Sequence, residues 1–127
     1  MTKAVWKTHP EAQDFPNAGH YLALVFSAGA AARLVKALRR AKPAEHAGKD
    51  ILRASRLRLL PRDDPHVVAN LRKIARGKKL SPLLLVRGDA ARDLPLIVAD
   101  GYHRICAAYY HDYDEPVPCV IVARPKS

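Results

Sequence analysis

Apolar residues recur along this chain with two different spacings, and each spacing predicts a different element. Two segments, 31–40 and 65–75, carry apolar residues three and four positions apart with polar residues between them, the pattern of amphipathic helices. Three short apolar runs, 83–86, 96–99 and 117–122, are typical of strands, and the first is typical of a strand buried on both faces. Helical and strand patterns in one chain predict a mixed α/β fold.

The other segments have weaker patterns. Residues 21–26 favour a helix because of their alanine and leucines, whereas 49–61 favour an edge strand because Leu57 and Leu59 alternate with arginines. Residues 1–16 are polar and interrupted by proline, which indicates a loosely attached arm, and 43–48 have the composition of a loop.

From these patterns we expect one compact unit in two parts. An N-terminal arm and helical extension would cover residues 1–48, and the main domain would cover 49–127. The prolines at the beginning of the last strand place that part of it near a sheet edge.

Length and composition fit one intracellular domain. The chain has 127 residues, no apolar stretch long enough for a membrane span and no apolar leader at its N-terminus, so we expect no membrane partner and a cytoplasmic location. Cys106 and Cys119 lie in apolar surroundings without metal-ligand spacing, which predicts buried thiols rather than a zinc site or a disulfide.

Positive charge is concentrated in the middle of the chain. Of the net charge of +10, the block from Arg33 to Lys79 carries fifteen lysines and arginines against four acids. A cationic face of this kind attracts anionic partners such as nucleotides, nucleic acids or acidic proteins. A solvated basic surface is the structural alternative.

The candidate chemistry lies at Asp100-Gly101-Tyr102-His103-Arg104, between the strand 96–99 and a segment that turns helical. A helix N-terminus presents free N–H groups and positive potential, so it can hold a phosphate. We expect Asp100 to cap the helix, the N–H groups of residues 101–103 to face a ligand, and Arg104 to add mobile positive charge. The structural alternative is a capped helix with a salt-bridged arginine.

The order of elements from Lys49 to Val122, together with the Asp-Gly-X-His-Arg motif and the downstream Val117-Pro118, resembles the ParB/sulfiredoxin-like superfamily. The resemblance implies a small mixed sheet with packed helices that binds a nucleoside triphosphate, CTP or ATP, through the motif at the helix start. It covers a little over half of the chain. Three branches are similar: CTP-hydrolysing partition proteins, free serine kinases and the sulfinic acid reductase sulfiredoxin.

The resemblance also implies roles for individual residues. Gly101, Tyr102, His103 and Arg104 would contact phosphates, and His103 is the candidate acid or base. The Asp100 carboxylate repels a phosphate at the helix start, so Asp100 is a candidate catalytic residue that holds a bridging Mg²⁺; if it only caps the helix, no metal is required. Further phosphate contacts are expected from four residues before the motif: Lys49, Arg53, Lys79 and Ser81.

Departures from the family patterns bear on which of the three branches this chain resembles. Tyr102 stands where sulfiredoxin has its catalytic cysteine, and Cys106 lies a helical turn further on, which excludes the reductase chemistry. The sequence ends at Ser127 without the helix-turn-helix of partition proteins. The leading hypothesis is therefore a ParB-like nucleotide-binding protein, and the sequence leaves open whether it hydrolyses the nucleotide, transfers its phosphate or only senses it. The alternatives are a small-molecule kinase and a nucleic-acid-binding or nuclease-like module that uses the basic block.

Overall fold

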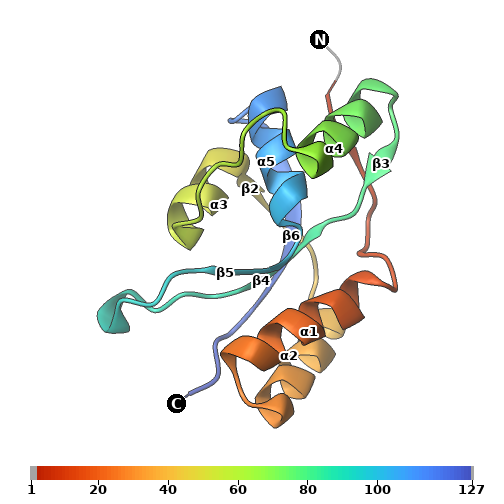
Figure 1. The fold of residues 1–127 in the computed structure, drawn as a ribbon. Helices are drawn as coiled ribbons and strands as arrows, with labels where there is room; N and C mark the ends of the chain where they lie inside the picture. The colour runs from red at the N-terminus through yellow and green to blue at the C-terminus, as the bar shows by residue number, and fades with distance from the viewer. Residues whose placement is uncertain (1–2, 127) are drawn as a thin grey trace.

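A four-stranded mixed sheet forms the centre of the molecule in the computed structural model, which describes residues 3–126 (Figure 1). Its strand order is β2 (Ala44–Ala47), β6 (Pro116–Val122), β4 (Leu83–Val86) and β5 (Ile97–Asp100). Strand β6 is parallel to β4 and antiparallel to β2, and β5 is antiparallel to β4. The mixed α/β class expected from the sequence is confirmed.

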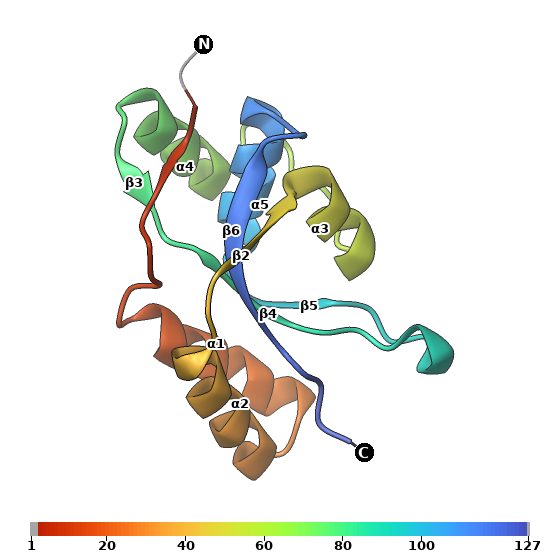
Figure 2. The same ribbon diagram turned by 180° about the vertical axis from the view of Figure 1, so that it is seen from behind.

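Helices cover both faces of this sheet (Figures 1 and 2). One face carries α1 (Asp14–Val25) and α2 (Ala28–Arg40), and the other carries α3 (Gly48–Ser55), α4 (Pro65–Ala75) and α5 (Tyr102–His111). A short two-stranded parallel sheet, β1 (Val5–Trp6) with β3 (Lys79–Leu80), lies beside α4. A short 3-10 turn, Ala90–Arg92, lies in the connection from β4 to β5.

Alternation along the strands divides the core into two parts. Leu83 and Leu85 of β4 pack with α3, α4 and α5, whereas Leu84 and Val86 pack with α1 and α2. All four side chains are buried, because successive strand residues point to opposite faces and both faces are covered. This confirms the prediction of a strand buried on both faces.

Helix α4 begins and ends where its capping residues predict. The side chain of Asp64 accepts hydrogen bonds from the N–H groups of His66 and Val67 at 3.0 and 3.1 Å, and Pro65 occupies the first helical turn. Gly77 follows the helix with a φ of +69°, a conformation that glycine adopts without a steric penalty. The helix they delimit packs beside α5, where the candidate site lies.

The expected strand over residues 49–61 is wrong. Residues 48–55 form α3, whose Ile51, Leu52 and Ser55 recur at helical spacing on its buried side. Arg56 ends the helix in the left-handed conformation, with a φ of +57°. The alternation of Leu57 and Leu59 lies in the extended chain after the helix, where no partner strand is present among residues 3–126.

The expected loop and arm before residue 49 are also corrected. Residues 44–47 form the edge strand β2, so the sheet crosses the boundary expected between residues 48 and 49. The N-terminal segment is held by β1 pairing with β3, and α1 begins at Asp14, earlier than its apolar stretch suggests. Both segments form strands because residues distant in the sequence pair with them. The start of β6 pairs only with β2 until Cys119, as its prolines predict.

The basic block does not form one face. Its α2 residues lie on one side of the sheet, and its α3 and α4 residues lie on the other (Figure 2).

Cys106 and Cys119 are buried free thiols, as the sequence predicts, and burial raises the pKa of Cys119 to about 11. Within residues 3–126, no helix has the length and apolar character required to cross a membrane.

Candidate functional site

The Asp-Gly-X-His-Arg motif forms the junction between β5 and α5. Asp100 is the last residue of β5, and Gly101 precedes the helix with a φ of +112°, which disfavours any residue with a side chain. Gly101, not Asp100, occupies the cap position, and no side chain caps the helix. The expected capping role of Asp100 is therefore wrong.

The helix start leaves its first N–H groups available to a ligand. The first intrahelical bond runs from the N–H of Ile105 to the carbonyl of Gly101 at 2.9 Å. The N–H groups of Tyr102, His103 and Arg104 thus come before the first intrahelical donor and have no acceptor within the helix. The set of free donors is shifted by one residue from the expected 101–103, because the cap lies one residue later than predicted.

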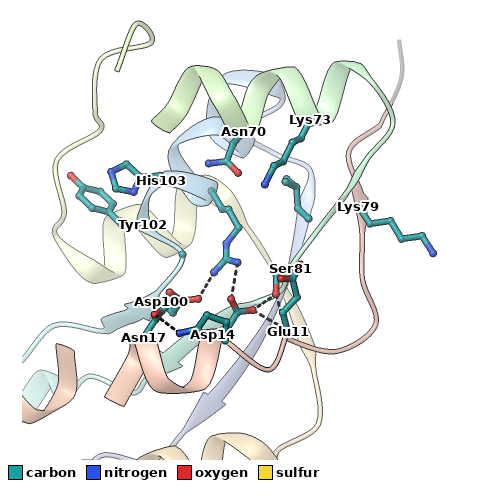
Figure 3. Close-up of a pocket in the computed structure, with 14 residues that line it drawn as sticks. Glu11, Asp14, Asn17, Asn70, Lys73, Lys79, Ser81, Asp100, Tyr102 and His103 are labelled. Atoms are coloured by element: carbon teal, nitrogen blue, oxygen red, sulfur yellow. Dashed lines mark hydrogen bonds and ion pairs between the residues drawn. The ribbon is translucent and has the colours of Figure 1, made fainter. Parts of the chain in front are cut away.

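These residues border a pocket of about 360 Å³ (Figure 3). Four parts of the chain form its walls: the start of α1 with the loop before it, α4, the segment 79–81 and the β5–α5 junction. The lining residues are Glu11, Gln13, Asp14, Asn17, Asn70, Lys73, Lys79, Leu80, Ser81, Asp100, Gly101, Tyr102, His103 and Arg104. The volume lies within the range of small-ligand pockets.

The floor of the pocket is an ion-pair network centred on Arg104 (Figure 3). Its guanidinium donates to Asp100 Oδ2 at 2.6 Å and lies 3.7 Å from Asp14 Oδ1. The three side chains are 14, 17 and 10% exposed for Arg104, Asp100 and Asp14, so the network is largely shielded from water. Arg104 is therefore held between two carboxylates, and the expectation of a mobile charge at the pocket mouth is wrong.

Asp14 connects this floor to the N-terminal part of the chain. Its carboxylate accepts hydrogen bonds from the Ser81 hydroxyl and, at 2.8 Å, from the N–H of Glu11. The Ser81 hydroxyl also accepts from the N–H of Glu11 at 3.1 Å. The predicted site residue Ser81 is thus present in the pocket, but it is buried and bonded to Asp14.

Electrostatics of the floor favour additional positive charge. Burial raises the pKa of Asp100, and the neighbouring Asp14 raises it further, while the Arg104 guanidinium opposes both effects. Two carboxylates share one guanidinium, so the network carries one excess negative charge when both are ionised. The Nε atom of Arg104 is buried and has no hydrogen-bond partner within residues 3–126.

The rings of the motif gather at one side of the pocket. His103 lies between Tyr102 and His66, with ring centroids 5.8 and 4.7 Å away, and the Tyr102 hydroxyl donates to the carbonyl of Arg58 at 2.5 Å. Figure 3 shows both motif rings directed away from Ser81. The acid–base role expected for His103 stays a prediction.

The expected cationic contacts divide between the pocket and the rest of the surface. Lys79 borders the pocket, but its side chain points outward (Figure 3). Lys49 pairs with Asp114 at 2.8 Å, and Arg53 lies beside Asp50 at 3.4 Å, in both cases outside this pocket. The structure thus places neither Lys49 nor Arg53 at the site, because the segment that carries them is α3 and not a strand leading to the pocket.

Several lining residues were not predicted. Lys73 and Asn70 come from α4, and Lys73 points into the pocket (Figure 3). His66, Asn70 and Lys73 recur at helical spacing, a polar stripe on the side of α4 that faces α5. This spacing was the available signal. Asp14 and Asn17 have no comparable signal, because only the packing of α1 against β5 brings them here.

Comparisons with models of protein families, with curated proteins and with solved structures found no match to this chain.

Proposed function

We propose that this protein binds a nucleoside triphosphate, CTP or ATP, in the pocket at the start of α5. The observation that carries the proposal is the uncapped N-terminus of a ten-residue helix opening into a pocket beside Lys73. Free backbone donors and the helix dipole favour a phosphate group there. The resemblance of Asp100–Arg104 to the ParB/sulfiredoxin motif supports the same ligand class.

The residues of the pocket suit different parts of this ligand. The N–H groups of residues 102–104 and the ammonium group of Lys73 are donors for phosphate oxygens. Lys79 can swing toward the same oxygens from the rim. Arg104 holds the carboxylates of the floor in place and does not itself supply the free positive charge.

A magnesium ion fits the donor set around Asp100. Mg²⁺ in nucleotide sites is held by one or two carboxylates together with phosphates and water, so it does not require a larger protein cage. Among residues 3–126, no group of three or more His, Cys, Asp or Glu side chains is arranged for a metal ion. Asp100 and Asp14 would hold the ion, which would neutralise their excess charge beside the phosphates.

Thermal-shift and calorimetric titration with CTP, ATP, ADP and GTP, each with and without Mg²⁺, tests the proposal. A ligand that binds only the native state raises its apparent stability. We expect at least one triphosphate to bind and Mg²⁺ to strengthen the binding. Failure of all four nucleotides to bind in both conditions would refute the proposal.

Lys73→Ala locates the site. Loss of one charge-assisted contact should weaken nucleotide binding by at least about tenfold, because such contacts contribute about 1.5–3 kcal/mol. Lys78→Ala is the matched control, since Lys78 follows the same helix but does not line the pocket. Equal effects of the two variants would place the nucleotide elsewhere.

A further inference from the structure

A second concave surface lies between α3 and the hairpin of β4 and β5, and it shares no residue with the pocket at α5. Two hollows, of about 200 and 480 Å³, adjoin there. Both are lined by Ala54, Arg87 and Leu96, so they form one continuous groove. Figure 1 shows the hairpin extending past α3 on this side of the sheet. We call this surface the α3–hairpin groove.

The floor of the α3–hairpin groove is apolar. It is formed by Ile51 from α3, Leu85 from β4, Ile121 from β6 and Leu96 before β5. Ile51 and Leu85 are buried, whereas Leu96 and Ile121 are only half-buried and thus remain accessible. A concave apolar floor of this kind gains stability when a partner side chain covers it.

Charged residues surround this floor, and the arginines outnumber the acids. Arg53 in α3, Arg56 after α3 and Arg87 after β4 line the groove. Asp50 and Asp89 also line it, but each lies beside an arginine, at 3.4 Å from Arg53 and 3.9 Å from Arg92. Arg53 and Arg56 form exposed ion pairs of 3.4 and 2.6 Å with Asp50 and Asp93.

Exposed pairs of this kind contribute only about 0–1 kcal/mol, so a partner carboxylate can replace one at little cost. Arg87 has no carboxylate partner within the described part of the chain.

We infer that the α3–hairpin groove binds an acidic peptide segment of a partner protein, with one large aliphatic side chain on the apolar floor and carboxylates on the arginines. Complementary charge around an apolar centre is the usual composition of a peptide-binding groove. A single-stranded nucleic acid fits the groove less well, because it binds through stacking on aromatic rings. The lining contains no Phe, Tyr or Trp residue.

Selection from a displayed library of random peptides about ten residues long tests this inference with the whole 127-residue chain. We expect enrichment of peptides that combine Asp or Glu with Leu, Ile or Phe. An enriched peptide, synthesised with a fluorescent label, should bind in anisotropy titrations, and its affinity should fall as salt increases.

Two variants locate the binding surface. The double variant Arg53→Glu/Arg87→Glu reverses exposed charges and should weaken binding at least about tenfold. Ala54→Trp fills the groove without changing charge and should weaken binding to a similar extent.

Each variant has a matched control on α2, on the opposite face of the sheet. Arg33→Glu/Lys36→Glu makes the same change of charge, and Ala32→Trp adds the same bulk at an exposed position. Binding should be unchanged in both controls.

Three results would overturn the inference: no enrichment of acidic peptides, equal weakening by the α2 controls, or weakening by neither groove variant. A single-stranded oligonucleotide that displaces the peptide and requires Arg53 and Arg87 would assign the surface to nucleic acid instead.

Discussion

Arg104→Met is the most informative perturbation of this protein, because it separates a structural role of Arg104 from direct contact with a ligand. Methionine keeps most of the aliphatic volume but removes the guanidinium. Asp14 and Asp100 would then remain in the pocket floor without their shared cation. Two carboxylates left together in a largely buried place disfavour the folded state.

The expected loss of stability follows from the burial of the network. Removing one partner of a buried ion pair costs about 3–5 kcal/mol. The three side chains retain 10–17% exposure, and the remaining contact with water favours the lower end, about 3 kcal/mol. That is a large fraction of the about 5–15 kcal/mol by which a typical domain is stable.

Urea unfolding followed by circular dichroism measures this loss. With a denaturant dependence of about 1–3 kcal/mol per molar urea, the midpoint of Arg104→Met should fall by about 1–3 M. In an Asp100→Asn background, the same substitution should cost less by about 1–2 kcal/mol, because one of the two uncompensated carboxylates is gone.

A loss below about 1 kcal/mol, the value of an exposed pair, would refute this interpretation of the network. Equal losses in the parent and Asp100→Asn backgrounds would show that Arg104 and Asp100 are not coupled. Either result would show that Arg104 does not stabilise the fold by neutralising these carboxylates.

Three further predictions concern the same framework. Burial raises the pKa of Asp100 in the folded state above its ordinary value of 3.8, so the folded state binds the proton more tightly than the unfolded state does. The stability of the parent relative to Asp100→Asn should therefore fall as the pH rises above 3.8. Urea midpoints of the two proteins, measured from about pH 4 to pH 7, would show or contradict this trend. Gly101→Ala should lower the free energy of unfolding in urea by about 1–3 kcal/mol, because the φ of Gly101 is +112° and a Cβ would lie 2.8 Å from the Arg104 guanidinium. Gly77→Ala should cost less, because Gly77 has open space around it. The reverse order would contradict the strain at the β5–α5 junction. Asp64→Ala should cost about 1 kcal/mol by removing the α4 cap, and Asp63→Ala, which removes no cap, should leave the urea midpoint nearly unchanged.

Local patterns were sufficient for the elements whose stability arises mainly from neighbouring residues. Short, contiguous sequence patterns predicted four such features: the cap at Asp64, the apolar stripe of α2, the strand Leu83–Val86 and the helix that follows Gly101. The motif residues also line one pocket, because a strand that ends at a helix start brings the residues of that turn to one place.

Tertiary packing decided what the local patterns left ambiguous. Residues 44–47 are a strand only because β6 offers them an edge, and residues 48–55 are a helix because their apolar side packs on α5. Neither partner is near in sequence, so short-range propensity could not choose between the alternatives.

The pairing of the charged side chains in the site could not be predicted from the sequence either. Arg104 and Asp100 are four residues apart and their pairing is a local possibility, but Asp14 lies 90 residues before Arg104 and reaches it only because α1 packs along β5. Sequence alone determined the types of charged group in this protein. The fold determined that an arginine expected to meet a ligand is instead enclosed by two carboxylates, since burial and distance, which set the strength of an ion pair, exist only in the folded chain.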